Sequence, residues 1–258
     1  YRRHVFQHGE DKVRALLPSA IRGPVFGALA AVYPKADWAP RPLRAKATLL
    51  ALAESGEEGY ARGLSVTLPG ARRALYSDAF AASLDGFRAE EELVALMRSA
   101  PGRSGLDRAQ YADLKSWLPG DILTKVDRTS MAVSLEAREP LLDHRLIEFA
   151  ASLPENLRLR RGEGKWLLKK TMQRYLPDDI LYRPKQGFVT PIAEWLRGPL
   201  AGAARGIAGG SLAQTGFFAP TAISTMAEAH IAGRADHSRT LWQLLMLEKS
   251  LAQLGVSA

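Results

Sequence analysis

The sequence predicts a mainly helical protein, and three observations lead to that prediction. Apolar residues recur with a helical period along most of the 258 residues. Only one short run, Ser65-Val66-Thr67-Leu68, has the β-branched composition typical of a strand. The hydrophobic fraction of 47% provides ample material for a core. No run approaches the ~18 apolar residues that a membrane-spanning helix needs, so we expect no membrane span.

The helices follow one another along the chain. Val13, Leu16 and Leu17 form a first apolar stripe, and a second apolar stretch continues to Pro34. Residues 38–42 carry two prolines, which predict an extended linker. Further helices are expected at Leu43–Glu54, Pro69–Tyr76, Glu90–Arg98, Leu106–Trp117, Asp121–Glu136, His144–Ser152, Lys165–Tyr175 and His237–Leu254.

These elements suggest three parts: N-terminal helices and a linker (1–42), a helical core (43–200) and C-terminal helices (201–258). The chain begins Tyr1-Arg2-Arg3 without a start methionine, so we expect it to be an internal piece of a longer polypeptide. The absence of cysteine excludes disulfides, thiolate metal sites and cysteine nucleophiles. A reducing, cytoplasmic location fits this composition best.

The charge is unevenly distributed. The formal net charge is +8 and the sequence pI is about 9.8, which permits contact with nucleotides, other polyanions or anionic membranes. Residues 158–185 hold nine basic and three acidic side chains, so six of the eight net charges lie in this stretch. Its aromatic residues are not interleaved with the cations as a nucleic-acid stacking platform would need. A basic helical module that binds nucleic acid or a partner protein is therefore the weaker alternative.

Two stripes are expected on the helix at 121–136. The apolar stripe, expected in the core, consists of Ile122, Val126 and Val133. The charged stripe beside it consists of Asp121, Lys125, Arg128 and Glu136. Such a row could hold a polyanion while its carboxylates orient the cations; the alternative is a helix with solvated intrahelical ion pairs.

Three further positions stand out. Asp143 is expected to be the N-cap of the helix at 144–152. Lys165 follows two glycines at a helix start, which favours anion binding, although Trp166 stands where a Walker motif needs Ser or Thr. Lys185 is flanked by Pro184 and Gly187, so it could stabilise charge on a phosphate or a tetrahedral intermediate; the alternative is a surface turn.

Metal and hydrolase sites are not supported. His4 and His8 are four residues apart, but only Glu10 lies near them in the sequence, and no nucleophile elbow occurs. We therefore predict no metal-binding residues in this chain.

Taken together, several motifs closely resemble the synthetase domain of glutamine-dependent asparagine synthetases. The similarity is clear from about Leu114 to Leu200. The motifs are Leu118-Pro119-Gly120-Asp121, Thr124-Lys125-Val126-Asp127-Arg128, Ser134-Leu135-Glu136-Ala137-Arg138, Pro140-Leu141-Leu142-Asp143-His144, Gly164-Lys165 and Arg183-Pro184-Lys185-Gln186-Gly187-Phe188. The first hundred residues look most like the exosortase-associated amidotransferase branch, whose acceptor is less certain than aspartate.

The resemblance implies a fold and a reaction. The fold would be the helical C-terminal half of an α/β synthetase domain of the adenine-nucleotide α-hydrolase-like type, without its parallel sheet. The reaction would use ATP and Mg²⁺ to adenylate aspartate or a related carboxylate, and ammonia released from glutamine would then displace AMP. The partners would be an N-terminal glutaminase domain and possibly a second copy in a homodimer.

The family's pyrophosphate loop, Ser-Gly-Gly-x-Asp-Ser, is absent. The nearest string, Ser104-Gly105-Leu106-Asp107, lacks a glycine and follows no strand, so we interpret it as unrelated. On this ground the chain alone is expected to be inactive. If the family's parallel sheet normally packs against these helices, its absence would leave their inner face uncovered. That face would be an apolar patch, which predicts self-association.

The resemblance also implies roles for individual residues. Lys185 and Lys165 match phosphate-contacting, catalytic lysines. Lys125, Asp127 and Arg128 match the helix that faces the phosphate end of the pocket. The expected supporting residues are Glu136 and Arg138, as a buried pair, and Asp143. Glu139 departs from the family pattern, in which a small or apolar residue precedes the proline.

Overall fold

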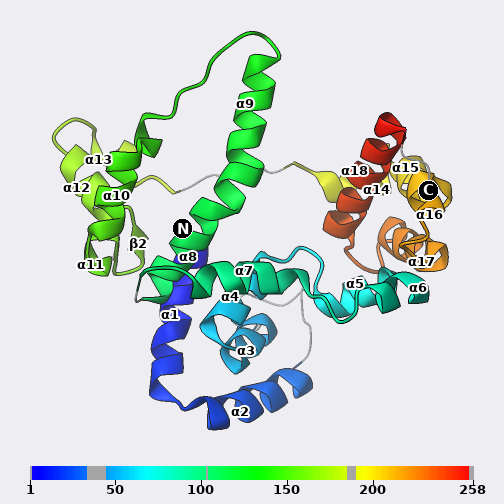
Figure 1. Ribbon diagram of the computed structural model, residues 1–258, viewed down its shortest axis with the longest axis horizontal. Coiled ribbons are helices and arrows are strands. Elements are labelled where there is room, and N and C mark those ends of the chain that lie inside the picture. The colour runs from blue at the N-terminus through cyan, green and yellow to red at the C-terminus, as the bar shows by residue number, and fades with distance from the viewer. Residues whose placement is uncertain (1, 34–44, 103, 185–189, 256–258) are drawn as a thin grey trace. The chain divides into compact units, whose positions relative to one another are not determined.

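The protein is mainly helical, as predicted (Figure 1). Strands in the described part of the chain form a single antiparallel hairpin, β1 (Leu159–Arg160) and β2 (Glu163–Gly164). The computed structural model describes residues 2–33, 45–102, 104–184 and 190–255. The expected linker at 38–42 and the Lys185 loop lie outside these residues.

The chain divides into two compact units. Unit 1 comprises Tyr1–Leu64 and Ala89–Pro184, and unit 2 comprises Ser65–Arg88 and Lys185–Ala258. The three-part division at residues 42 and 200 stays a prediction about domains, because compactness alone does not show that a segment folds independently.

Unit 1 contains most of the helices. They are α1 (Arg2–Leu16), α2 (Ser19–Val32), α3 (Lys46–Ala53), α4 (Gly56–Leu64), α7 (Ala89–Arg98), α8 (Gly105–Lys115), the π-helical turn η2 (Leu118–Leu123), α9 (Thr124–Met131), the 3₁₀ turn η3 (Pro140–Leu142), α10 (His144–Ser152), α11 (Glu155–Arg158), α12 (Trp166–Met172) and α13 (Asp178–Leu181). A small buried cluster joins α4, α7 and α8 through Tyr60, Met97, Ala109 and Ala112.

Polar side chains also join the helices of unit 1. His4 Nε2 on α1 lies 3.1 Å from Asp113 Oδ2 on α8, and the hydroxyl of Tyr60 on α4 donates to Asp113 Oδ1 at 2.9 Å. Arg158 at the end of α11 donates to Gln110 Oε1 on α8 at 2.6 Å and forms an ion pair with Asp107. These bonds link segments far apart in the sequence, so unit 1 depends on polar contacts as well as on its small core.

The string Ser104-Gly105-Leu106-Asp107 has a structural role. Ser104 is the N-cap of α8: its side chain accepts a hydrogen bond from the Asp107 backbone, and the Asp107 side chain accepts one from the Ser104 backbone. This reciprocal capping box satisfies two backbone N–H groups at the helix start. The interpretation of the string as unrelated to a phosphate loop is consistent with that role.

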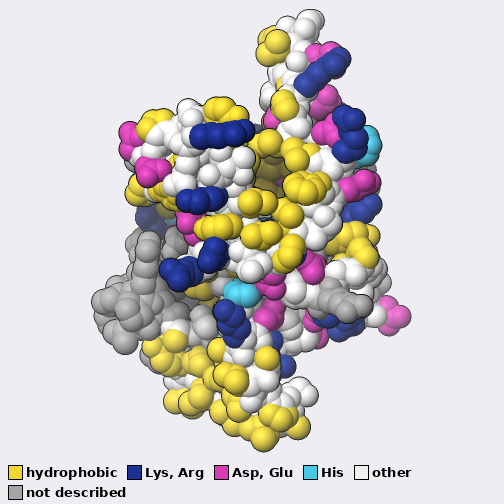
Figure 2. All heavy atoms as spheres, turned by 90° about the vertical axis from the view of Figure 1, so that its left-hand side faces the viewer, with side chains coloured by type: hydrophobic (Ala, Val, Ile, Leu, Met, Phe, Trp, Pro, Cys, Tyr) yellow, Lys and Arg dark blue, Asp and Glu magenta, His cyan; other side chains and the backbone are white. Residues whose placement is uncertain are grey.

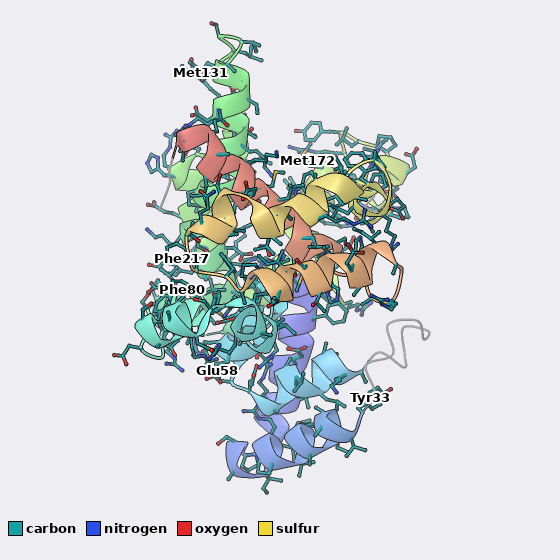
Figure 3. The ribbon with its side chains drawn as sticks, turned by 90° about the vertical axis from the view of Figure 1, so that its right-hand side faces the viewer. Tyr33, Glu58, Phe80, Met131, Met172 and Phe217 are labelled. Carbon is teal, nitrogen blue, oxygen red and sulfur yellow. The ribbon has the colours of Figure 1, made fainter. Side chains whose placement is uncertain are left out.

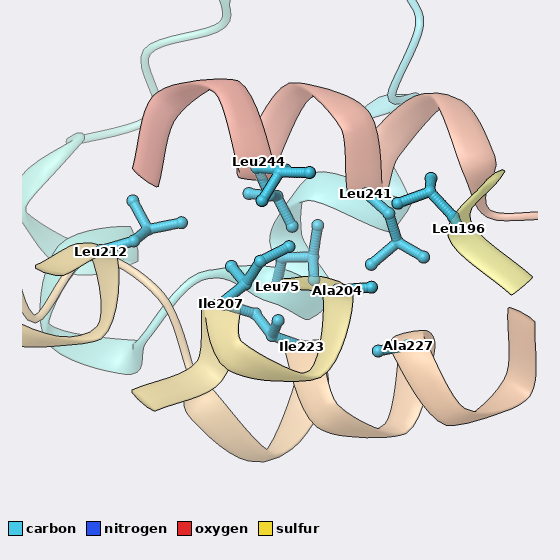
Figure 4. Packing of buried hydrophobic residues seen from close by; sticks show 10 residues of the cluster. Leu75, Leu196, Ala204, Ile207, Leu212, Ile223, Ala227, Leu241 and Leu244 are labelled. Carbon is cyan, nitrogen blue, oxygen red and sulfur yellow. The ribbon is translucent and has the colours of Figure 1, made fainter. Parts of the chain in front are cut away.

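Unit 2 is built around a larger apolar core (Figure 4). Its elements are α5 (Pro69–Leu75), α6 (Asp78–Ser83), α14 (Ile192–Arg197), α15 (Ala201–Gly206), the 3₁₀ turn η4 (Ile207–Gly209), α16 (Ser211–Gln214), α17 (Pro220–Ile231) and α18 (Ser238–Leu254). Leucine and isoleucine side chains from six of these elements meet in the core, including Leu75, Leu196, Ile207, Leu212, Ile223 and Leu241.

Specific contacts surround that core. The imidazole of His230 is fully buried, with Nε2 3.1 Å from the Ala193 carbonyl, while Nδ1 accepts from the His237 backbone N–H at 3.2 Å. Both ring nitrogens are thus paired, and the bonds tie α14 to α17. Phe80 and Phe217 lie side by side with ring centroids 4.7 Å apart (Figure 3).

The predicted strand at Ser65–Leu68 is wrong, because these residues form an irregular segment. Pro69 starts α5 directly after it, and the hydroxyl of Thr67 is bonded to Thr240 and Gln243 on α18, at 3.1 and 3.0 Å. The segment therefore docks through a side chain rather than through backbone pairing.

Unit 1 has an exposed apolar stripe on α2. Ile21, Val25 and Leu29 are four residues apart, share one face of the helix and are all exposed. Figure 2 shows hydrophobic side chains gathered over α2 at the bottom of the view. Self-association through such a surface stays a prediction.

Candidate functional site

The helix that carries three predicted site residues starts with an irregular turn. Pro119 has no N–H to donate, and the chain passes through the π-helical turn η2 before α9 begins at Thr124. The hydroxyl of Thr124 donates to the Pro119 carbonyl at 2.7 Å. Such turns are frequent at functional sites. The prediction of one regular helix over 121–136 is therefore wrong at both ends, since α9 also ends early, at Met131 (Figure 3).

The charged side chains of α9 face solvent. Lys125 Nζ lies 3.0 Å from Asp121 Oδ1, and both side chains are about half exposed. Asp127 and Arg128 are exposed, and within the described ranges neither forms an ion pair. This arrangement contains the solvated intrahelical pair of the alternative interpretation, and it leaves two charges available to a ligand.

The apolar stripe of this helix is not in a core. Ile122 and Val126 are only half-buried, and Val133 is 75% exposed. The stripe breaks because α9 ends before Val133 and the backbone turns at Ser134, whose φ is +59°. A helical period cannot extend beyond the end of its helix.

Glu136 and Arg138 do form an ion pair, with Arg138 Nε 2.9 Å from Glu136 Oε1. The expectation that the pair is buried is wrong, because the side chains are 67% and 81% exposed. The two residues lie in an irregular segment after α9, where no described element covers them. An exposed ion pair of this kind contributes little stability.

Asp143 is the N-cap of α10, as predicted. Its carboxylate accepts from the Arg145 backbone N–H at 2.9 Å. The Arg145 guanidinium donates to both carboxylate oxygens, at 3.2 and 3.1 Å, and these hydrogen bonds lower the pKa of Asp143. Asp143 therefore stays ionised as a structural cap.

Lys165 lies between β2 and α12, at the N-cap position of that helix. Its φ of +58° and ψ of +32° are left-handed, a conformation that non-glycine residues adopt uncommonly. Backbone outliers of this kind cluster at functional sites. Lys169, four residues further along the chain, lies 2.7 Å from Glu163 Oε1. Lys185, the other predicted catalytic lysine, lies outside the described residues.

Aromatic rings do lie against the cations of the basic stretch, so the expectation of no interleaving is wrong. The Arg160 guanidinium lies 4.6 Å from the centre of the Trp166 ring, and Arg174 lies at the same distance from its neighbour Tyr175. The ammonium of Lys169 is 4.9 Å from the Tyr182 ring. The pairs of Arg160 with Trp166 and of Lys169 with Tyr182 could not be predicted from the sequence, because the folded chain brings together residues that are several positions apart.

A cavity of about 280 Å³ lies beside the hairpin. It is lined by Arg160, Arg161, Glu163 and Trp166. The sequence alone shows these arginines only as part of the net charge. Placing them beside one cavity would have required predicting the tight turn between β1 and β2, for which Gly162 was the available signal.

The predicted partners include neither a membrane nor a bound metal of this chain. Among the described residues, no helix has both the length and the apolar character that a membrane crossing requires. In the same residues, no three carboxylate or imidazole side chains come together as a metal-binding group. We therefore assign no metal ligand to this part of the chain.

Comparisons with known proteins identify the relatives. The family model described as asparagine synthase matches residues 4–252. The chain is 37% identical over 169 residues to a putative glutamine-hydrolysing asparagine synthetase of Mycobacterium bovis, covering 63% of this chain and 26% of that protein. It is 35% identical over 143 residues to glutamine-hydrolysing asparagine synthetase 1 of Bacillus subtilis, covering 55% and 22%.

A mammalian relative matches a shorter stretch. The glutamine-hydrolysing asparagine synthetase of Mus musculus is 44% identical over 92 residues, covering 34% of this chain and 16% of that protein. The chain thus matches about a quarter or less of the length of these curated relatives. No solved structure matches the chain.

Proposed function

Because the chain belongs to the asparagine synthase family, we propose that it serves in ATP-dependent amide formation. In this proposal, ATP adenylates the side-chain carboxylate of aspartate and releases pyrophosphate. Ammonia derived from glutamine then attacks the acyl-adenylate, a C–N bond forms, and AMP leaves. The observation that carries the proposal is the family match over residues 4–252, which includes every predicted site residue.

We assign Lys165 and Lys185 to the phosphate chain. A lysine ammonium close to a phosphoryl group stabilises the negative charge that develops as pyrophosphate leaves. The exposed side chain of Lys165 and its left-handed backbone support this role. Lys125, Asp127 and Arg128 are proposed to contact the phosphates or the intermediate, and Asp127 would orient the neighbouring cations.

Glu136, Arg138 and Asp143 are proposed to support the site. Asp143 fixes the start of α10, and the exposed pair of Glu136 and Arg138 lies between α9 and that helix. Magnesium is expected to arrive with ATP, whose phosphates are its usual ligands. The described residues offer no ligand set of their own, so no step is assigned to the ion.

The acceptor and the partners are part of the proposal. Aspartate is the first candidate; another carboxylate would fit the resemblance to the exosortase-associated branch. A glutaminase domain would supply the ammonia. The proposal also includes a cytoplasmic location and a homodimer.

The decisive experiment measures pyrophosphate release by the complete protein that carries this sequence, with ATP, Mg²⁺, ammonia and aspartate. Lys185→Ala should lower turnover by about 100-fold or more, because one preorganised charge contact is typically worth that factor. Release with a different carboxylate but not with aspartate would correct the acceptor. If none of the carboxylates supports pyrophosphate release, the proposal of amide formation is contradicted.

A second candidate function is favoured by the pairs of cations and aromatic rings around α12. Arg160 with Trp166 and Arg174 with Tyr175 could stack on bases and neutralise phosphates of a single-stranded nucleic acid. Titration with a fluorescent oligonucleotide at two salt concentrations tests this candidate. Tight binding that weakens steeply with salt would favour it, and no binding at low salt would exclude it.

A further inference from the structure

We propose that the cavity beside the β1–β2 hairpin is a binding site for a small polyphosphate, with Arg160 and Arg161 as its ligand-binding residues. The cavity has a volume of about 280 Å³, close to the lower end of the range of ligand pockets, ~300–1,000 Å³. That volume suits a pyrophosphate or the phosphate chain of a nucleotide, and it is too small for a polymer.

The charge in the cavity is positive once its contacts are considered. Glu163 is the only carboxylate among the four lining residues, and Lys169 Nζ lies 2.7 Å from its Oε1. Arg160 and Arg161 form no ion pair within the part of the chain that the structure describes. Two guanidinium groups are therefore left to attract an anion.

The position of Arg160 suits an anion. Its guanidinium lies 4.6 Å from the centre of the Trp166 ring, within the range of a cation–π contact. A planar guanidinium on a ring face keeps its N–H donors at its edge, where they can form paired hydrogen bonds with phosphate oxygens. Trp166 therefore supports Arg160 without using its donors.

Arg161 is placed by the turn. The register pairs Arg160 with Glu163, so Arg161 and Gly162 are the two central residues of the hairpin loop. Their φ values are +53° and +80°, as in the type I′ turns for which Asn-Gly is preferred. An arginine at the first position is conformationally costly, and among the described residues no ion pair of its side chain offsets that cost.

The inference rests on the proposed function only for the identity of the ligand, since ATP and pyrophosphate are its substrate and product. Binding itself needs no turnover. If the arginine variants bind pyrophosphate as well as wild type does while Lys185→Ala still lowers pyrophosphate release, the inference fails and the proposed function stands. Binding without turnover would leave the inference standing while the proposed function failed.

The test is calorimetric titration of the full chain with inorganic pyrophosphate. We compare wild type with the double variant Arg160→Gln, Arg161→Gln and with a control of equal charge change in unit 2, Arg88→Gln, Arg239→Gln. Both control residues are exposed and carry no predicted role. Circular dichroism checks that all three proteins are folded.

We expect one pyrophosphate per chain and an affinity at least tenfold weaker in the hairpin variant, with a change of less than twofold in the control. Arg161→Lys should lose part of the affinity, because it keeps the charge and loses the planar donors. Equal binding by wild type and hairpin variant, or equal weakening of both double variants, would overturn the inference.

Competition experiments identify the source of the phosphate. ATP should displace pyrophosphate from wild type, and adenosine should not. Displacement by adenosine as effective as displacement by ATP would show that the adenosine part is recognised rather than the phosphate chain, and it would overturn the assignment.

Discussion

Unit 2 and the motif segment, residues 118–184 of unit 1, differ most in where their apolar side chains lie. In unit 2, side chains such as Leu196, Ile207 and Leu241 are fully buried in one cluster. Of residues 118–184, all of which the structure describes, Leu159 alone is buried. Unit 2 therefore has its own source of stability, whereas the motif segment holds charges at a surface where ligands can reach them.

Because of this difference, we expect substitutions in the two regions to have different effects on stability. Substitutions in the unit 2 cluster remove buried apolar contacts and leave cavities. Substitutions in the motif segment remove exposed charges, which contribute little to stability. The predictions below separate these effects, beginning with the largest.

The largest expected effect is on unit 2. Leu241→Ala removes a side chain that is 0% exposed, and we expect the free energy of unfolding to fall by about 2–5 kcal/mol. Denaturant unfolding followed by tryptophan fluorescence measures this, since Trp242 packs against the cluster. The matched substitution Leu146→Ala on α10, where the side chain is 39% exposed, should cost less than about 1 kcal/mol. Equal costs would contradict the comparison.

A smaller effect is expected where α18 caps another helix of unit 2. Glu248 accepts from the backbone N–H groups of Ser211 and Leu212, at 3.0 and 2.6 Å. A Cβ at Gly210 would lie 2.3 Å from Glu248 Oε1 and displace it, so Gly210→Ala should destabilise by about 1–2 kcal/mol. Thermal melts of the two glycine variants measure this effect. A Cβ at Gly209 meets no atom within 4 Å, so Gly209→Ala is the control and should be near neutral.

The smallest effect concerns pH and the polar contacts of unit 1. Partial burial raises the pKa of Asp107, but hydrogen bonds from Arg158 and from the Ser104 backbone outweigh it, and the net shift is downward. Stability from this group is therefore present above the ordinary pKa of 3.8 and is lost as pH falls through the lowered value.

Asp107→Asn should flatten the loss of stability on acidification and should lower stability at pH 7. Urea unfolding at pH 7 and at about pH 3 measures both changes. Asp78→Asn, which alters a fully exposed carboxylate, is the control and should leave the acid response unchanged. An unchanged acid response in Asp107→Asn would show that this bond does not stabilise unit 1.

Much of this structure could be predicted from the sequence. Helical periodicity located α7, α8, α10 and α18 to within about two residues, because strong apolar stripes and caps such as Asp143 mark them. The motifs led to the family that the comparisons confirm.

Other features could not be predicted because they depend on tertiary contacts. The Ser65–Leu68 run has strand composition, yet Thr67 bonds to α18. Val133 fits the period of α9 but lies beyond its end. Arg160 and Trp166 meet only once the hairpin has formed. Period and composition describe local preference, and they carry no information on which distant segment supplies a partner.

The central claim is that the charged residues proposed as ligand contacts, Lys165, Lys185, Lys125, Asp127 and Arg128, serve ligands rather than stability. Lys165→Ala tests this claim most directly. Pyrophosphate release and the free energy of unfolding are measured together in the complete protein. We expect release to fall by about 100-fold while the free energy of unfolding changes by less than about 0.5 kcal/mol. Unchanged release, or a loss of release accompanied by a large loss of stability, would contradict the claim.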